Sequence, residues 1–476
     1  MSDTIKQIKT EQGNFYPLTV ATAVKDPNFT NDSNQPMNQS EINAYLDYKI
    51  KYPDSSIGSH PDSVYGVTHY YANASSTLSR VGNLDLHKTL PVQSLMKRCL
   101  LTDDGQVTYL NPANSNLLIS EQQAVLDGTE GQVMVEIPEH WRKFTLDTNN
   151  KTYTCEISLF QFPGAHKVNK CYISAYEASL NRTSLKLSSV VNKTAEYRGG
   201  DNTSSYDGTY RTLLGRPVTS INLTNFRTYA NNRGANWKCQ EWDIYCTVFW
   251  LYTVEYASLD CQKSYNATLT DEGYKQGGLG SGVTGISDWN GYNGYRPFVP
   301  CGHTNSLGNY TGVVTYPTPN ADGTIRYNAP VPSYRGIENP FGHVWKWTDG
   351  FLAKGNGTIQ DYYICRNRNN YASTLNSDYI QVGTSPTGNG WKMGILRNQY
   401  GDILTASVGG SSSTYFCDYH YQAVSNGTIY GVLSGGCADN GGCAGFGFLS
   451  SDSGPGSADV YFGSRLCYCS KAKIIE

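Results

Sequence analysis

Apolar and polar residues alternate in short runs along most of the chain, and this pattern predicts strands joined by turns. The run Gln132–Ile137 follows two glycine-containing turn signals and ends before a proline. Residues 106–110 follow an Asp-Asp-Gly turn, and residues 171–179 alternate in the way a half-buried strand does. A turn at residues 339–342 leads into an aromatic strand at 344–349. We therefore expect many short strands.

A helical period occurs in fewer places. Residues 240–262 have the strongest helical signal, a short helix is expected at 225–231, and another at 40–48 follows a serine cap. The longest segment places five residues at helical spacing: Ile244, Val248, Leu251, Tyr252 and Glu255. Strands together with separate helices predict an α+β fold.

The length of 476 residues exceeds one ordinary domain. Changes in composition and in the pattern of apolar residues predict three parts. They are an attachment or oligomerisation segment at 1–45, a β-rich spacer domain at 46–164 and a larger domain at 165–476. The last of these contains the stretch 411–469, which differs from the rest of the chain in composition.

Charge and hydropathy exclude several classes of partner. The formal net charge of -3 and the pI near 6.3 give no basic surface for nucleic acid, and no apolar run is long enough to span a bilayer. The N-terminal residues have neither a basic nor an apolar signal region, so we expect synthesis in the cytoplasm without a signal peptide. Most of the 13 cysteines are then expected to be free thiols. No metal site or cofactor is predicted.

The stretch 411–469 has the composition of a binding surface. It contains no Lys, Glu, Met or Trp, although all four occur elsewhere, and it is rich in Tyr, Phe, Ser, Gly, Asp and Cys. Antibody paratopes use the same mixture, because rigid aromatic rings supply contact area while small polar groups adapt. The predicted contact residues are Tyr415, Phe416, Tyr419, Tyr421, Tyr430, Cys437, Asp439, Cys443, Phe446, Asp452, Ser457, Asp459 and Tyr461.

The residues missing from this stretch, Lys, Glu, Met and Trp, fit a rule at the level of codons. If the adenines of AAC codons are randomised, the resulting NNC codons encode Tyr, Phe, Cys, Ser, Asp and Gly but never Lys, Glu, Gln, Met or Trp. A low-complexity tract is the alternative interpretation, but such tracts lack an apolar frame. Here apolar residues interrupt the polar runs at 432–433, 444–445 and 462–466. We favour a folded stretch.

Motifs spread over residues 165–476 resemble those of a known superfamily. Four motifs occur in this order: the strand YISAYEAS, the helix containing Trp242 and Glu255, the segment GHVWKWTDG, and the C-terminal motif Gly463-Ser464-Arg465-Leu466. This set resembles the C-type lectin fold of the formylglycine-generating enzyme superfamily. Within that superfamily, the C-terminal part resembles the variable proteins of diversity-generating retroelements. The resemblance rests on a glycine-rich motif, which we call the frame: Gly435-Gly436, Gly441, Ala444-Gly445 and Phe448.

This resemblance implies a function without covalent chemistry. In that family a retroelement diversifies the exposed face of the lectin fold, and the protein is often a receptor-binding protein of a phage tail. The expected partner is a bacterial surface receptor, either glycan or protein. The N-terminal half resembles tail-fibre modules, so we expect it to contact other tail proteins in the virion. A homotrimer is expected from the resemblance alone.

Two enzymatic alternatives remain open. A capsule-degrading hydrolase would use two carboxylates, for which Asp418, Asp439, Asp452 and Asp459 are candidates, with His420 beside the first. A copper-dependent oxidase of the formylglycine-generating type would use paired cysteines among Cys417, Cys437, Cys443, Cys467 and Cys469, but no pair matches that motif. The calcium-binding triplets of sugar-binding lectins are also missing. Trp345, Trp347 and Arg465 are expected in the core.

Overall fold

The computed structural model describes residues 6–9, 15–18 and 61–476. The chain divides into two units, residues 1–56 with 105–107, and residues 57–104 with 108–476. In the first unit, β1 (Lys6–Lys9) pairs antiparallel with β2 (Phe15–Leu18). The rest of the predicted attachment segment at 1–45 and the helix predicted at 40–48 lie outside the described residues.

The fold is mostly β, so the prediction of an α+β class was wrong. Strands make up 35% of the structure and helices 13%. The described helices are α3 (Leu86–Thr89), α4 (Pro91–Ser94), α5 (Leu223–Asn231), α6 (Trp242–Tyr256) and α7 (Trp289–Asn293). Three of the five, α3, α4 and α7, have only four or five residues.

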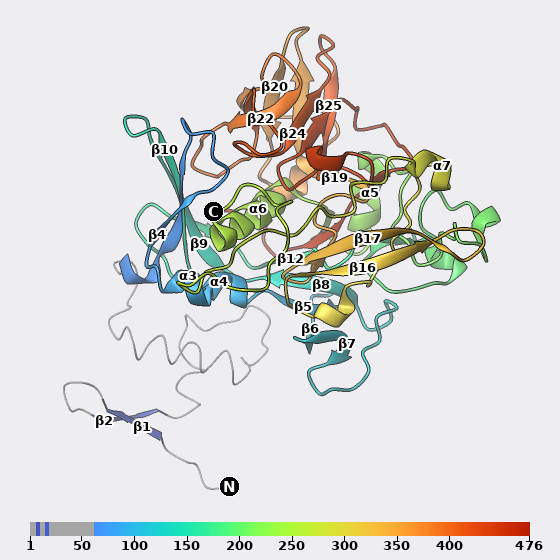
Figure 1. Ribbon diagram of the computed structural model, residues 1–476, viewed down its shortest axis with the longest axis horizontal. Coiled ribbons are helices and arrows are strands. Elements are labelled where there is room, and N and C mark those ends of the chain that lie inside the picture. The colour runs from blue at the N-terminus through green and yellow to red at the C-terminus, as the bar shows by residue number, and fades with distance from the viewer. Residues whose placement is uncertain (1–5, 10–14, 19–60) are drawn as a thin grey trace. The chain divides into compact units, whose positions relative to one another are not determined.

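The described strands of the second unit form five sheets (Figure 1). A five-stranded sheet has the order β11 (His166–Val168), β9 (His140–Asp147), β10 (Thr152–Ser158), β3 (Tyr65–Tyr70), β4 (Ser79–Gly82). A seven-stranded sheet has the order β15 (Trp237–Cys239), β28 (Leu466–Tyr468), β12 (Cys171–Ser174), β8 (Gln132–Ile137), β5 (Lys97–Leu101), β6 (Val107–Asn111), β7 (Asn114–Leu118).

The largest sheet carries most of the C-terminal chain. Its order is β21 (Ile380–Thr384), β20 (Gln360–Ile364), β19 (Trp345–Gly355), β25 (Ile429–Ser434), β26 (Leu449–Ser451), β24 (Tyr419–Gln422), β22 (Gly390–Ile395), β23 (Thr405–Val408). A ninth strand, β27 (Phe462–Gly463), pairs in parallel with β19. Two small sheets pair β13 (Ser179–Asn181) with β14 (Lys186–Ser188), and β16 (Gly312–Pro319), β17 (Ile325–Tyr334) and β18 (Ile337–Glu338).

The seven-stranded sheet crosses the boundary predicted between residues 164 and 165. Strand β8, from the predicted spacer, pairs with β12, which in turn pairs with β28 near the C-terminus. The structure therefore does not separate the two segments at this point. All four residues of β12 are buried, so the expected half-buried alternation is wrong, since both faces of this strand are covered.

Helix α6 is the one long helix that the sequence predicted, and it runs through the middle of the second unit (Figure 1). All 15 of its side chains are buried, so it has no solvent-facing stripe. A helix that is apolar on every side belongs inside a core. Indole nitrogens fix it to the loop after β22, because Trp242 Nε1 donates to Asp402 Oδ1 at 2.7 Å and Trp250 Nε1 donates to the Gly401 carbonyl at 2.7 Å.

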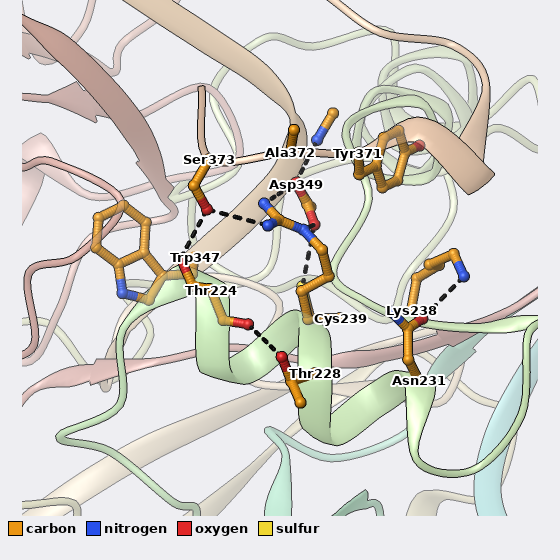
Figure 2. Close-up of polar contacts among 12 residues, drawn as sticks. Thr224, Thr228, Asn231, Lys238, Cys239, Trp347, Asp349, Tyr371, Ala372 and Ser373 are labelled. Carbon is orange, nitrogen blue, oxygen red and sulfur yellow. Dashed lines mark hydrogen bonds and ion pairs between the residues drawn. The ribbon is translucent and has the colours of Figure 1, made fainter. Parts of the chain in front are cut away.

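The shorter helix α5 fastens the long strand β19. Arg227 of α5 donates to both carboxylate oxygens of Asp349, at 2.6 and 3.0 Å. Figure 2 shows Asp349, Ser373 and Thr224 around this contact, and the Thr224 and Ser373 hydroxyl oxygens lie 2.6 Å apart. A bidentate arginine–carboxylate pair is strong and directional. It holds the strand whose first residue, Trp345, belongs to the site described next.

Among the described residues, no helix is both long and apolar enough to cross a membrane.

Candidate ligand-binding cavity

An open cavity of about 620 Å³ lies at the surface of the largest sheet. Sixteen residues line it, and fifteen of them belong to the stretch 411–469. They are Trp345, Tyr419, Tyr421, Leu433, Asp439, Asn440, Cys443, Phe448, Ser450, Asp452, Ser453, Ser457, Ala458, Asp459, Tyr461 and Phe462. We call this the variable cavity. Its volume is within the range of small-ligand sites.

Strand β24 supplies two tyrosines because side chains alternate along a strand. Tyr419 and Tyr421 share one face and line the cavity, whereas His420 and Gln422 point to the opposite face and are buried. Strand β26 lies between β24 and β25, with Ser450 opposite both Tyr421 and Leu433. The sheet therefore places these cavity residues side by side.

The glycine-rich frame at 435–448 forms a tight loop. Its ends are tied by a bond from the Gly435 N–H to the Phe448 carbonyl at 2.9 Å, and the Gly445 N–H reaches the Gly435 carbonyl at 3.3 Å. Gly436 has a φ of +79°, and a Cβ there would lie 2.8 Å from the Ala444 Cβ. Only glycine fits such a conformation without strain. The loop displays Asp439, Asn440 and Cys443 to the cavity.

Phe446 anchors the same loop to α6. Its carbonyl accepts the Tyr245 hydroxyl, and its ring centroid lies 5.2 Å from that of Tyr252. Its N–H also contacts Cys261 Sγ at 3.4 Å. The Phe446 side chain is buried, so it supports the cavity from below and does not line it.

The last wall is the irregular segment 452–461. The Gly431 N–H donates to the Ser453 carbonyl at 3.0 Å, and the Ser220 N–H donates to the Asp459 carbonyl at 2.9 Å. The Trp345 N–H donates to the Tyr461 carbonyl at 3.0 Å. These backbone bonds hold the segment while its side chains remain available to the cavity.

Aromatic rings form much of the lining. Phe448 packs edge-to-face on Trp345, with ring centroids 4.6 Å apart, and Tyr419 lies 5.9 Å from Phe448. Tyr461 packs on Phe462 at 5.0 Å. Burial raises the pKa of the Tyr461 hydroxyl, and the nearby carboxylates of Asp459 and Asp452 raise it further. The carboxylates of the cavity therefore disfavour ionisation of the Tyr461 hydroxyl.

Three carboxylates line the variable cavity, at Asp439, Asp452 and Asp459. Asp452 Oδ1 accepts from the Ser450 and Ser453 hydroxyls at 2.8 and 3.2 Å, and Asp439 Oδ1 contacts Cys437 Sγ at 3.1 Å. Within the described part of the chain none of the three has an ion-pair partner.

Beneath Trp345 lies a separate buried charge cluster, which belongs to the framework. Lys346 Nζ is 2.9 Å from Glu177 Oε1, and His343 Nδ1 is 2.5 Å from Glu177 Oε2. Two backbone N–H groups donate to His343 Nε2, so Nδ1 carries the proton. Burial alone would raise the pKa of Glu177, but Lys346 and His343 outweigh it and bring the pKa to about 2. Burial lowers the pKa of Lys346 to about 8.

Eight of the thirteen predicted contact residues line the variable cavity: Tyr419, Tyr421, Asp439, Cys443, Asp452, Ser457, Asp459 and Tyr461. Whether they contact a ligand stays a prediction. Phe416, Tyr430, Cys437 and Phe446 are buried, which corrects their assignment to an exposed surface. Their rings and thiol pack against neighbouring elements. Tyr415 is half-buried and lies outside the cavity, because its N–H is bound to the Ala74 carbonyl at 2.7 Å.

Two cavity residues were assigned to the core from sequence or left undecided. Trp345 was expected in the core with Trp347, and Phe448 was named only as a residue of the glycine-rich frame. Trp347 is fully buried, whereas Trp345 and Phe448 reach the cavity with one edge. Both tryptophans lie on the same face of β19, because they are two residues apart, and only Trp345, the first residue of the strand, lines the cavity. Arg465 is buried as expected and donates to the carbonyls of Ser174, Glu338 and Asn339.

The residues considered for catalysis are mostly removed from the cavity. Asp418 and His420 are buried, and Asp418 Oδ2 accepts the Gly447 N–H at 2.8 Å. Burial raises the pKa of Asp418 well above its ordinary value, and Lys392 opposes this shift. All thirteen cysteines lie in the described residues and are free, and all except Cys443 are buried. Among the described residues, no group of three His, Cys, Asp or Glu side chains could hold a metal ion.

No family model matches the sequence, and no curated protein matches it. Among solved structures, the chain is similar to PvdO from Pseudomonas aeruginosa, with a TM-score of 0.32, 10% identity, and 72% of this chain and 97% of that chain covered. It is also similar to the Major Tropism Determinant P3c variant, with a TM-score of 0.27, 12% identity, and 87% and 85% covered. The U1 variant gives 0.24 and 11%, with 78% and 71% covered. None of these likenesses assigns the chain to a family.

Proposed function

We propose that the chain is a receptor-binding adhesin of a phage tail, the variable protein of a diversity-generating retroelement, and that the variable cavity binds the receptor. The observation that carries the proposal is that a stretch defined by composition coincides with a cavity defined by the structure. The stretch with the paratope-like composition, read from sequence alone, supplies fifteen of the sixteen residues around the cavity.

The stretch contains two kinds of residue, those that fix the backbone and those that line the cavity, and this supports the same function. Residues that fix the backbone, such as Gly436, Gly445 and Phe446, are buried or conformationally required. Other residues of the stretch, such as Asp439 and Ser457, line the cavity. Substitutions at exposed positions usually change stability by less than about 0.5 kcal/mol. A surface of this kind can be diversified while the fold persists.

Binding without covalent chemistry is part of this proposal. A hydrolase would need a carboxyl that keeps its proton beside one that does not. Asp418 has a strongly raised pKa, but it is buried and does not line the cavity. Release of reducing sugar from bacterial capsule by the purified chain would contradict the proposal.

The test is the DNA next to the gene. We expect a second copy of the codons for residues 411–469 that differs only at adenines, beside a reverse-transcriptase gene. Template adenines are expected in the codons of the cavity residues Tyr421, Asp439 and Asp459, and not in those of the frame residues Gly436 and Gly445. Absence of any such copy, or adenines spread evenly over frame and cavity codons, would refute diversification of this surface.

A further inference from the structure

The variable cavity has a one-sided charge. Three of its sixteen lining residues are aspartates, and none is lysine, arginine or histidine. Like charges that share one site repel one another, and each favours the approach of a positive charge. The lining residues therefore favour a positively charged group over a negatively charged one.

The framework treats its acidic groups differently. Glu241 is bound by Arg368 at 2.6 Å, Glu255 by Arg335 at 2.7 Å and Asp349 by Arg227 at 2.6 Å. Arginine thus neutralises these three buried acids. Asp439, Asp452 and Asp459 have no such partner among the described residues, so their charge is available to a ligand.

The aromatic lining adds a second feature that suits a cation. Trp345, Tyr419, Tyr421, Phe448 and Tyr461 all contribute to the wall. The face of an aromatic ring attracts an ammonium or guanidinium group, and aromatic walls next to carboxylates recognise such groups in general. An anionic ligand would meet repulsion from all three aspartates. A neutral ligand would leave their charge uncompensated.

We propose that the variable cavity binds an organic cation, an ammonium or guanidinium group, held by Asp439, Asp452 and Asp459 against the aromatic wall. The inference deepens the proposed function, since it names the ligand class of the same site. The cation is presented by the receptor, as a lysine or arginine side chain or as an amino sugar. These sources share one chemistry, and the experiment separates them.

The experiment measures binding of small probes to the full-length chain by ligand-observed NMR, in buffer with chelator so that no divalent ion enters. N-acetyl-arginine amide is compared with N-acetyl-citrulline amide, its neutral isostere. Glucosamine is compared with N-acetylglucosamine in the same way. We expect the charged member of at least one pair to bind at least 10-fold more tightly, and added salt to weaken it. Equal binding within both pairs, or binding of neither member of either pair, overturns the proposal.

Matched variants locate the site. The triple variant Asp439→Asn, Asp452→Asn, Asp459→Asn keeps the shape of the cavity and removes its charge, so we expect loss of the preference for the cation. The control is Glu130→Gln, Asp271→Asn, Glu272→Gln, which changes the total charge equally at three exposed positions outside the cavity. A preference that falls equally in both variants means that the net charge of the protein attracts the probe, and the proposal is then wrong.

The outcome is separable from that of the proposed function. Cation binding without a template copy of 411–469 near the gene would retain the cavity's ligand class and remove the diversified adhesin. A template copy with no cation preference would retain the adhesin and remove the ligand class. Fluorescence of the aromatic residues on urea titration shows that each variant is folded before it is scored.

Discussion

The frame at 435–448 can be tested with one pair of glycine substitutions. Gly445 has a φ of +153°, and a Cβ there would lie 1.9 Å from Asp418 Oδ1 and 3.0 Å from Cys261 Sγ. Gly442, three residues earlier, is exposed, and its Cβ would meet Ser412 and Trp391 at 3.7 Å, an ordinary contact distance. Gly445→Ala and Gly442→Ala thus make the same chemical change in two different environments.

The expected difference follows from these contacts. A non-glycine residue in such a backbone conformation costs about 1–3 kcal/mol. Forcing Asp418 aside in a packed interior costs about 1–3 kcal/mol more. We therefore expect Gly445→Ala to lower the free energy of unfolding by about 2–6 kcal/mol. Gly442→Ala should change it by less than about 1 kcal/mol, and could raise it, because alanine restricts the unfolded chain.

Tryptophan fluorescence during urea denaturation measures both variants, with the change in midpoint multiplied by the slope of the unsubstituted chain. A second readout is the buried Asp418, whose bond from the Gly447 N–H should show faster amide exchange in Gly445→Ala. If both alanine variants unfold at the same urea concentration, the separation of this loop into frame and displayed positions is wrong.

Three further predictions follow from burial. Phe446→Ala should lower the free energy of unfolding by about 3–5 kcal/mol, because the ring is 2% exposed, whereas Tyr421→Ala, 46% exposed, should change it by less than about 0.5 kcal/mol in the same urea assay. Cys443 should be the first cysteine that a neutral maleimide labels in the native chain, as mapped by peptide mass spectrometry, because the other twelve are buried; prior labelling of a buried one would contradict this. Burial lowers the pKa of His69 to about 4 and those of His140 and His420 to about 3. The unfolded chain then binds protons below about pH 6.5 that the folded chain does not, so stability should fall towards pH 4 by up to about 1.4 kcal/mol per histidine and pH unit. A urea midpoint that is flat between pH 7 and pH 5 would refute the histidine argument.

Local pattern predicted the type and position of two central elements. The run Gln132–Ile137 is a strand with the predicted bounds. The helix expected at 240–262 is α6, which is shorter and covers Trp242–Tyr256. The pattern could not predict how far each element is buried. The helix was expected to have one apolar face, yet all its side chains are buried, because the sheets and loops that surround it come from distant parts of the sequence.

The fold class failed for a related reason. The sequence has a strong helical segment at 240–262, whereas short strands of two to four residues, such as β27 and β28, have too few positions to establish a period. Their pairing depends on long-range partners. The predicted boundary at 164/165 failed to separate two bodies in the same way, since β8 and β12 join across it.

The candidate site shows how much about a binding surface can be predicted from amino-acid composition. Amino-acid usage located the stretch, because display and core positions within it share one unusual composition. It could not divide aromatic residues between the two roles, so Tyr430 and Phe446 were grouped with Tyr421 although a β-strand or a loop turns them inward. The division depends on register, and register is set by contacts outside the stretch, such as the Tyr245 hydroxyl on the Phe446 carbonyl.

Trp345 illustrates the consequence for function. It is the one cavity residue outside 411–469, and it stands at the start of β19, where the Asp349–Arg227 pair and the Lys346–Glu177 pair fix the strand. A ring held in this way does not change when the displayed residues change. If the proposed function is right, this ring gives every version of the cavity the same aromatic face, and the other lining residues supply the contacts that differ from one receptor to the next. If the aspartates are among the diversified positions, the preference for cations belongs to this version of the surface, whereas the aromatic wall at Trp345 and Phe448 belongs to all of them.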